Sequence, residues 1–365
     1  MSMNGYVKKK KLLIITPKQF GYHIDYYNYA CFLSNKYDIT YLCWDYLLEK
    51  LTIPNVDINY ISRAGSKFKR NVVFIRAIVK TINTTDFDCV FTNYFKGCSL
   101  LLPFIFRQRS KINIDIRTGS VKRSRWKRYI ENTIIKSEAS LFAHQSIISN
   151  GLKQMLKISG NAVIIPLGAN KISPVQKNSK QINLIYVGTF YNRNLHQTIE
   201  GISKYLKKNP DADLNYTIIG NGDDTSEQLI AEAIAKYNLE KIIDLKGYVP
   251  SKDLIPFLKH AHIGVSYIPM TGYFQFQPAT KTFEYLLAGI PTLATSTYEN
   301  KLVVNDNNGV LIEDNSDSFA DGLNKMICKL PKLDPLSIQK SVEEFEWKKI
   351  VEKLEFEILN KINIP

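Results

Sequence analysis

One stretch decides how the rest of the sequence is interpreted: Pro278-Ala-Thr-Lys-Thr-Phe-Glu-Tyr-Leu-Leu-Ala-Gly-Ile-Pro-Thr-Leu-Ala-Thr295. It predicts a helix that begins after Pro278, ends at Gly289 and leads into a buried strand, because proline favours helix starts and glycine favours helix ends. Lys281 and Glu284 lie three residues apart near the start of this helix. The unpaired N–H groups and positive potential of a helix start suit a phosphate, so the stretch predicts an anion site.

The same stretch resembles the donor-nucleotide signature of retaining glycosyltransferases of family 4, whose form there is close to P-S-K-x-x-E-Y-x-A-x-G-x-P. The matching residues are Pro278, Lys281, Glu284, Tyr285, Ala288, Gly289 and Pro291. The resemblance implies an α/β protein with the GT-B fold, in which two Rossmann-like, doubly wound parallel-sheet domains face each other across a cleft. It also implies a donor-binding role for Pro278, Thr280, Lys281 and Glu284, with Lys281 and Glu284 acting in catalysis as well. The alternative is a surface helix of an ordinary α/β domain.

The positive charge is concentrated in the first half of the sequence. The chain of 365 residues carries a formal net charge of +14. Residues 1–170 contain 26 Lys and Arg against 10 Asp and Glu, a net charge of +16, whereas residues 171–365 contain 22 against 24. Such asymmetry indicates a polyanionic partner for the first half: an anionic membrane surface, a phosphorylated lipid or a nucleic acid.

Length and cysteine content favour a two-domain protein with reduced thiols. A chain of 365 residues is long for one domain and comfortable for two. The five cysteines are odd in number and show no Cys-x-x-Cys spacing, so a cytoplasmic protein is expected. The apolar runs at residues 12–15 and 98–106 are too short for a signal peptide or a membrane-spanning helix.

Residues 11–15 predict a first buried strand, followed by a loop with Gly21 and a helix that begins near Tyr22. Strand, glycine-containing loop and helix form the first unit of a doubly wound sheet, whose loop faces the crevice where ligands bind. In family 4 this loop approaches the donor or the acceptor, so the resemblance implies donor binding at Gly21. The alternative is a glycine that only makes a turn.

Arg117 follows the strand predicted over residues 112–116, at a strand end where open α/β sheets place functional groups. Many family 4 enzymes have a histidine at about this position that helps at the sugar. The resemblance therefore implies a catalytic role for Arg117. It could bind a phosphate, bind an acidic sugar or orient the acceptor.

Two basic amphipathic helices are predicted in the first half, over residues 66–82 and 122–136. The first carries Lys67 and other cations opposite its apolar side, and the second carries Trp126 and Tyr129 among its cations. The first could be a helix that packs on the core with a solvated basic face, or a helix that lies against anionic lipid. The second is predicted to be a membrane-surface element.

A polar, proline-containing linker is predicted over residues 171–180. The predicted domains are an acceptor and membrane-side domain of residues 1–170 and a donor-binding domain of residues 171–347. A long helix is predicted over residues 341–359. The resemblance implies that the terminal segment, at about residues 348–365, returns to the first domain.

The second half opens with a predicted strand at residues 182–187, followed by a turn with Gly188 and Arg193. Family 4 normally has Val-Gly-Arg here and a lysine several residues on, and those two cations hold the donor diphosphate. In this sequence Thr189 takes the arginine position. The resemblance therefore implies donor binding by Gly188 and Arg193, with the Arg193 guanidinium on the diphosphate close to Lys281.

Three further features bear on the donor site. Gly247 and Tyr248 open a Gly-x-Val-Pro segment that the family uses to hold the nucleotide base. Phe276 lies eight residues before Glu284, where family 4 often has a glutamate beside the transferred sugar, so the usual sugar contact is in doubt. No cluster of acidic residues resembles a metal site, so neither a metal nor another cofactor is expected.

Together, resemblance and charge predict a metal-independent retaining glycosyltransferase that acts in surface-glycan synthesis (capsule, O-antigen or exopolysaccharide). It would move a sugar from a nucleotide-diphosphate sugar to a lipid-linked or polysaccharide acceptor. The basic first domain would hold it in the cytoplasm as a peripheral protein on the anionic inner face of the membrane. Two rivals remain: another GT-B enzyme, such as a sugar-nucleotide epimerase, and a basic nucleic-acid binder. The sequence lacks a recognised RNA-binding motif, so no nucleic-acid partner is expected.

Overall fold

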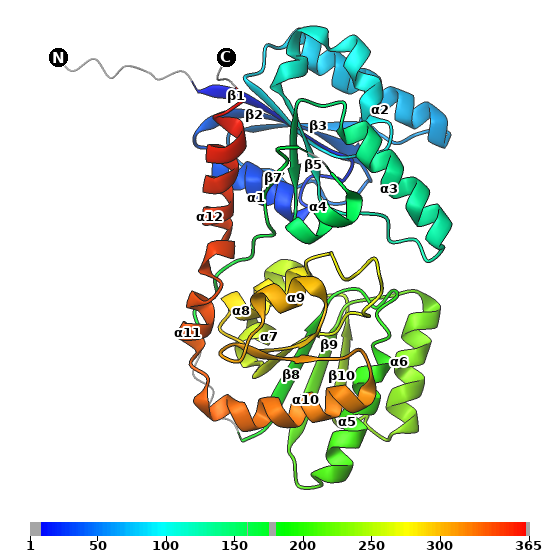
Figure 1. The fold of residues 1–365 in the computed structure, drawn as a ribbon, viewed down its shortest axis with the longest axis vertical. Helices are drawn as coiled ribbons and strands as arrows, with labels where there is room; N and C mark the ends of the chain where they lie inside the picture. The colour runs from blue at the N-terminus through cyan, green and yellow to red at the C-terminus, as the bar shows by residue number, and fades with distance from the viewer. Residues whose placement is uncertain (1–8, 159, 175–179, 363–365) are drawn as a thin grey trace, which may run out of the picture. The chain divides into compact units, whose positions relative to one another are not determined.

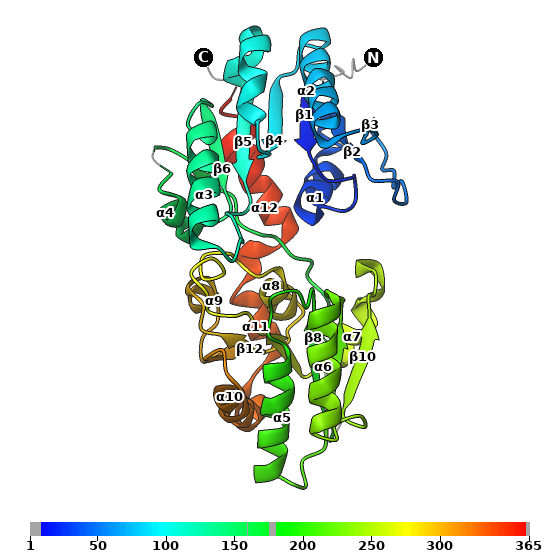
Figure 2. The ribbon, with the colours of Figure 1, turned by 90° about the vertical axis from the view of Figure 1, so that its right-hand side faces the viewer.

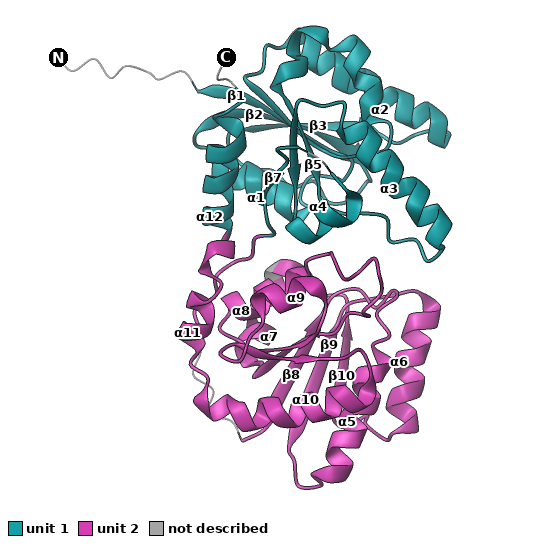
Figure 3. Cartoon of the chain, in the orientation of Figure 1, with its two compact units in different colours: residues 1–167, 347–365 teal, residues 168–346 magenta. Residues whose placement is uncertain are grey.

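The structure is a computed structural model that describes residues 9–158, 160–174 and 180–362. The chain separates into two compact units (Figure 3). Unit 1 comprises Met1–Leu167 and Trp347–Pro365, and unit 2 comprises Gly168–Glu346. The sequence prediction places these boundaries at residues 170 and 347. Part of its linker, residues 175–179, lies outside the described residues.

Unit 1 is built on a parallel sheet (Figure 1). In the described part of the chain this sheet has seven strands in the order β3-β2-β1-β4-β5-β6-β7, and each neighbouring pair is parallel. Its order reverses between β1 and β4, the kind of point at which open α/β sheets bind ligands. The strands are β1 (Lys10–Thr16), β2 (Tyr37–Asp45), β3 (Val56–Ser62), β4 (Cys89–Asn93), β5 (Ile112–Ile116), β6 (His144–Ile147) and β7 (Val163–Ile164).

The helices of unit 1 form two layers. Helix α1 contacts α12, while α2, η1, α3 and α4 contact one another in chain order. Right-handed crossovers place these two groups on opposite faces of the sheet. The helices are α1 (Ile24–Leu33), α2 (Lys67–Thr84), α3 (Arg125–Ala139), α4 (Asn150–Leu156) and α12 (Trp347–Leu354), the 3₁₀ helices η1 (Cys98–Phe104) and η2 (Phe106–Lys111), and the π-helical turn η6 (Glu355–Leu359).

Serine caps fix where the basic helices of unit 1 begin. The Ser66 hydroxyl accepts from the Lys69 N–H at the start of α2, and the Ser124 hydroxyl accepts from the Lys127 N–H at the start of α3. The helix predicted over residues 122–136 therefore starts three residues later, at Arg125. Both helices begin beyond the carboxyl ends of their preceding strands, so their amino-terminal halves lie at the same edge of the sheet.

Unit 2 has a second parallel sheet, with six strands among the described residues in the order β10-β9-β8-β11-β12-β13. Each neighbouring pair is again parallel, and the order reverses between β8 and β11. Its strands are β8 (Ile182–Val187), β9 (Leu214–Ile219), β10 (Ile243–Gly247), β11 (Ile263–Ser266), β12 (Thr292–Thr295) and β13 (Gly309–Ile312). The repeated topology gives both units the doubly wound architecture predicted from the sequence.

Helices cover the sheet of unit 2, and α5 and α6 lie side by side (Figure 2). The main core joins strand residues such as Tyr216 and Val265 to helix residues such as Ile199 and Phe319. The helices are α5 (His196–Lys208), α6 (Asp224–Lys236), α7 (Ile255–His260), α8 (Thr280–Leu287), α9 (Tyr298–Val303), α10 (Ser316–Lys329) and α11 (Pro335–Lys340), with the 3₁₀ helices η3 (Ser251–Asp253), η4 (Leu330–Lys332) and η5 (Glu343–Phe345).

Residues 251–260 form two short helices, η3 and α7, because Pro256 favours the first turn of a helix and sets the start of α7 at Ile255. The predicted helix at the end of the chain has different bounds in the structure. The terminal helix predicted from residue 341 begins at Trp347, since residues 341–346 make η5 and a parallel bridge between Glu346 and Ala169. Within the described residues we find no helix with the length and apolar character needed to cross a membrane.

Candidate functional site

Helix α8 forms one wall of the candidate site and is anchored to the sheet by its buried face. It begins at Thr280, with the extended residue Ala279 as its N-cap. Tyr285 on the buried face accepts a hydrogen bond from the Val187 N–H of β8 (2.8 Å). Gly264 of β11 leaves room for the tyrosine ring, because a Cβ there would lie 2.3 Å from a ring carbon. The opposite side of α8 is thereby held beyond the carboxyl end of β8.

Lys281 lies in the first turn of α8 and presents a buried ammonium group that has no hydrogen-bond partner among the described residues. Its Nζ atom lies 3.4 Å from the centroid of the Tyr186 ring. Gly188 makes space for it, since a Cβ at that glycine would lie 3.0 Å from Nζ. Burial and the nearby Arg193 guanidinium hold the pKa of Lys281 well below its usual value, and Glu284 only partly opposes them.

Arg193 comes from the turn between β8 and α5. Its Nη1 atom is buried and has no hydrogen-bond partner in the part of the chain that the structure describes. The guanidinium carbon lies 4.1 Å from the centroid of the Phe274 ring. Burial lowers the pKa of this guanidinium from its ordinary value. Lys281 and Arg193 therefore give the site two cationic groups with donors left to offer.

Glu284 lies one turn after Lys281 on the same side of α8. Burial raises the pKa of its carboxyl group, and the charge of Lys281 opposes that rise. A carboxylate here can accept a hydrogen bond from a sugar hydroxyl.

These side chains line one cavity of about 310 Å³ at the carboxyl edge of the unit 2 sheet. The structure thus brings together six residues that the sequence singles out: Gly188, Arg193, Pro278, Thr280, Lys281 and Glu284. The lining also includes residues that sequence reasoning missed, namely Val187, Ser251, Leu254, Ile268, Phe274, Gln277 and Ala279. The cavity thus pairs two cations and a carboxylate with apolar walls, which suits a phosphorylated ligand with a flat or apolar part.

Three residues assigned to the donor lie elsewhere. Gly247 and Tyr248 are outside the cavity lining, although Ser251 and Leu254 of the following segment belong to it. Tyr248 is exposed, and the carbonyl of Gly247 accepts from the Gly220 N–H (2.8 Å). Gly21 belongs to unit 1, where its positive φ of 88° makes the turn before α1.

The two departures from the family pattern have visible structural roles. Thr189 accepts a hydrogen bond from the Tyr186 hydroxyl through its carbonyl oxygen (2.8 Å). Phe276, which replaces a glutamate of the pattern, packs on Tyr298 with 5.2 Å between ring centroids and is absent from the cavity lining. The described cavity therefore has Glu284 as its one acidic residue.

Arg117 lies at the end of β5 in unit 1 and is buried in a polar network. Its Nε donates to the Asp25 carboxylate (2.8 Å), and its Nη1 and Nη2 donate to the carbonyls of Ile165 (2.6 Å) and Pro166 (3.3 Å). Asp115 lies 3.8 Å from the same guanidinium. The geometry gives Arg117 a structural role at this strand end, and its catalytic role stays a prediction.

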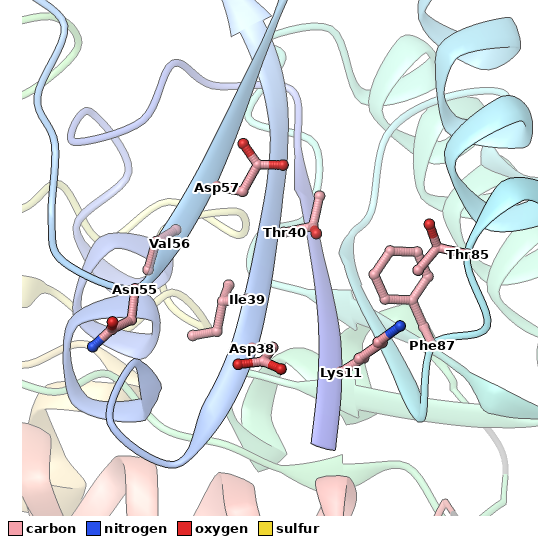
Figure 4. A pocket seen from close by; sticks show the side chains of 9 residues that line it. All are labelled: Lys11, Asp38, Ile39, Thr40, Asn55, Val56, Asp57, Thr85 and Phe87. Atoms are coloured by element: carbon pink, nitrogen blue, oxygen red, sulfur yellow. The ribbon is translucent and has the colours of Figure 1, made fainter. Parts of the chain in front are cut away.

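A second cavity, of about 560 Å³, lies in unit 1 (Figure 4). Lys11, Asp38 and Asp57 lie in its wall, near the amino-terminal ends of β1, β2 and β3. Open α/β sheets bind ligands at the opposite, carboxyl edge. Two carboxylates also disfavour an anionic ligand here, so we assign the candidate site to the cavity of unit 2. The described residues contain no group of three or more His, Cys, Asp or Glu placed to hold a metal ion.

Comparisons with known proteins bear on both units. Residues 181–329 match the family model described as Glycosyl transferases group 1. No curated protein sequence matches the chain significantly. Among solved structures, HepE from Anabaena in complex with UDP and glucose is similar, with a TM-score of 0.76 at 11% identity over 96% of this chain and 100% of that chain.

Two further structures share the architecture. A sucrose-phosphate synthase from Thermosynechococcus elongatus has a TM-score of 0.75 at 14% identity, over 95% of this chain and 98% of that chain. The lipopolysaccharide outer core galactosyltransferase WaaB, in its apo form, has a TM-score of 0.70 at 14% identity, over 96% and 99%. The two doubly wound sheets and these neighbours show that the chain has the GT-B fold, and the family match over most of unit 2 supports a glycosyltransferase.

Proposed function

We propose that the protein is a retaining, metal-independent glycosyltransferase that uses a nucleoside-diphosphate sugar as donor. The observation that carries this proposal is a pair of buried nitrogen atoms, Lys281 Nζ and Arg193 Nη1, that have no hydrogen-bond partner among the described residues and belong to residues that line one cavity. Buried charges are ordinarily paired, so an anionic ligand is the expected partner. The structures of HepE contain UDP or UDP-glucose, which makes UDP the first ligand to test.

The residues of the cavity suit stabilisation of a leaving diphosphate. Lys281 and Arg193 would neutralise the charge that develops as the bond between the sugar and the diphosphate breaks. The first N–H groups of α8 lack partners within the helix and would add donors. Glu284 would accept from the ribose of the nucleotide. Because two side-chain cations supply the positive charge, the proposed reaction needs no metal.

The resemblance of residues 278–291 to the family 4 signature is what supports our proposal that the reaction retains configuration. In this mechanism the acceptor hydroxyl attacks the anomeric carbon on the face from which the diphosphate leaves. A phosphate oxygen of the leaving group takes the proton of that hydroxyl. The contribution of the protein is alignment of the two substrates and electrostatic stabilisation.

We further propose that the acceptor is lipid-linked or a growing polysaccharide in surface-glycan synthesis, and that unit 1 docks on an anionic membrane surface. Trp126, Tyr129 and Ile130 of α3 are 69%, 65% and 40% exposed. The rings of Trp126 and Tyr129 stack with 6.1 Å between centroids. Exposed aromatic residues on a basic helix are typical of elements that lie in the headgroup layer of a bilayer.

The exposed charged residues of α3, Arg125 and Lys127, are basic, whereas its two acidic residues are partly buried and have partners within unit 1. Glu138 accepts from the Tyr94 hydroxyl (2.7 Å), the Gly97 N–H (2.9 Å) and the Ser99 hydroxyl (2.9 Å). Glu131 accepts from the Ser120 hydroxyl and pairs with Lys122. Helix α2 contains no acidic residue. Such a surface complements the anionic lipids of a cytoplasmic leaflet.

The donor proposal is tested with a calorimetric panel of UDP, GDP, dTDP and ADP. At least one should bind with micromolar affinity, and Lys281→Met should weaken that binding. A labelled donor incubated without acceptor separates the reaction classes, since an epimerase would isomerise the sugar and a transferase would not. Failure of the unaltered protein to bind any of the four nucleotides would contradict the proposal.

The membrane proposal is tested by tryptophan fluorescence with vesicles of phosphatidylcholine, with and without phosphatidylglycerol. Trp44 and Trp347 are buried, so a change on vesicle binding reports on Trp126. We expect a blue shift only with the anionic vesicles, weakened by salt. Charge reversal at Arg125 and Lys127 should abolish it.

A matched control reverses exposed lysines of unit 2, at Lys207, Lys241 and Lys259. That variant has an even larger change in net charge and should bind vesicles as the unaltered protein does. Equal losses in the two variants would show that net charge alone drives binding, and would contradict docking through α3.

A further inference from the structure

The two cations of the cavity rest on aromatic rings. The Tyr186 ring is fully buried, and its hydroxyl is fixed by donation to the Thr189 carbonyl (2.8 Å). The Lys281 ammonium lies 3.4 Å from the centroid of this ring. The ring therefore cannot turn away without breaking its own hydrogen bond, and it offers the ammonium a fixed, electron-rich face.

Arg193 has an equivalent seat on Phe274. Its guanidinium carbon lies 4.1 Å from the centroid of a ring that is 6% exposed. The backbone N–H of Phe274 donates to the Thr271 carbonyl (3.1 Å), and its ring packs on Tyr273 with 4.5 Å between centroids. A planar guanidinium stacks well on such a face. Its N–H groups lie in the guanidinium plane, so they point sideways, away from the ring, and stay available to a ligand.

An aromatic seat has a different chemical effect from a carboxylate seat. A carboxylate would occupy N–H donors and would compete with a phosphate for them. A ring face attracts the cation through its quadrupole and leaves the donors available. Glu284 is the one acid on the described lining, and its charge favours the ammonium of Lys281. The ring faces add a contact to each cation that occupies none of its N–H donors.

We propose that Tyr186 and Phe274 are positioning residues that hold Lys281 and Arg193 ready for the diphosphate of the donor. The inference rests on the proposed function, because it names which residues prepare the same site. Each ring orders a flexible cationic side chain before the ligand binds. Binding then costs less side-chain conformational entropy, because the donors are already in place. It predicts that loss of a ring weakens recognition of the diphosphate rather than of the nucleoside.

The test compares binding of UDP with binding of UMP by calorimetry, in the full chain. Tyr186→Leu should lower the preference for UDP over UMP by about tenfold, since a desolvated cation–π contact contributes about that factor. Phe274→Leu should lower it by about fivefold. Tyr186→Phe keeps the ring and should keep the preference within about twofold.

Two further variants keep the test decisive. Phe319→Leu removes another buried ring of unit 2, which packs on Tyr267 and has no cation over its face within the described part of the chain. This variant should lower thermal stability and leave the preference unchanged. In a Lys281→Met background, Tyr186→Leu should cause no further loss. The inference is overturned if Tyr186→Leu weakens UDP and UMP by the same factor, or if its effect persists in full without Lys281. If the unaltered protein binds none of the four nucleoside diphosphates, the proposed function fails first and the inference falls with it.

Discussion

Unit 1 and unit 2 each bury cations near the carboxyl ends of their strands. The two units differ in whether the N–H donors of these cations have partners within the described protein. Arg117 of unit 1 is enclosed by Asp25 and by two backbone carbonyls. Burial opposes its charge, yet Asp25 and its other neighbours outweigh burial and raise its pKa. Lys281 Nζ of unit 2 has no hydrogen-bond partner among the residues that the structure describes, and burial and the Arg193 charge lower its pKa. A cation whose donors are used within the protein stabilises the fold, whereas one with unused donors in a cavity is prepared for a ligand.

The largest expected effect concerns the buried polar network around Arg117 in unit 1. Arg117→Met should destabilise unit 1 by about 3–5 kcal/mol, because it leaves the buried Asp25 carboxylate without its partner. All three tryptophans, Trp44, Trp126 and Trp347, belong to unit 1, so tryptophan fluorescence in a denaturant titration measures this unit.

Arg117→Met should leave the affinity of unit 2 for UDP unchanged. The variant Asp25→Asn/Arg117→Met, which removes both charges, should recover part of the stability. Normal stability of Arg117→Met combined with loss of turnover would break the comparison. It would favour the catalytic role that the family resemblance implies for Arg117.

The second effect concerns Lys281 in the cavity of unit 2. Lys281→Met should weaken UDP binding by about a hundredfold, since a buried charge-assisted contact to a phosphate is lost. The same variant should melt no lower than the unaltered protein, because it removes a buried and unpaired ammonium group. A large loss of thermal stability in Lys281→Met would show that Lys281 is structural, like Arg117.

A third and smaller effect tests the space around the ammonium. Gly188→Ala should weaken UDP binding by about tenfold, because its Cβ would approach Lys281 Nζ and because φ at Gly188 is 141°, which disfavours alanine. Gly272→Ala is a matched control, since a Cβ there meets nothing within 4 Å. Calorimetric titration of both variants should separate them, and equal affinities would remove the steric argument.

The smallest expected effect is a pH dependence of a few fold. UDP binding should draw the pKa of Lys281 back up, so binding takes up a proton at pH values between its lowered and its restored pKa. Affinity should therefore fall as pH rises through that window, starting below the ordinary lysine value of about 10.4.

The unliganded protein should show the opposite trend. Its unfolded state binds more protons in the same window, so stability contributed by this group rises with pH. Calorimetry in buffers of different ionisation enthalpy measures the proton uptake, and Lys281→Met should abolish it. Uptake that persists in that variant would assign the proton to another group.

Local patterns allowed much of the fold to be predicted. The run at residues 182–187 was predicted as a strand and forms β8, and the helix predicted over residues 66–82 forms α2, whose start is capped by the Ser66 hydroxyl. The break before Trp347 could not be read from the sequence, since the helical pattern of residues 341–346 yields to the tertiary bridge at Ala169.

The sequence could single out residues of the candidate cavity where their charge suggests a chemical role. Lys281, Arg193 and Glu284 can be identified from the sequence because they are charged residues near the start of a predicted helix. Tyr186 cannot, because an aromatic residue in a buried strand is indistinguishable from core until a cation is found over its face. The pairing of Arg117 with Asp25 could not be predicted either, since the two residues are 92 positions apart and only the fold of the sheet brings them together.

The route of the chain has a consequence for how the protein is made. Unit 2 is an insertion within unit 1, and its two ends lie together, with the Ala169 N–H donating to the Phe345 carbonyl (2.9 Å). The ribosome therefore delivers all of the inserted unit before Trp347, Ile350 and Leu354, which are buried in unit 1. The nascent first unit must wait with an uncovered apolar face until its last helix emerges, while the inserted unit can complete its own folding.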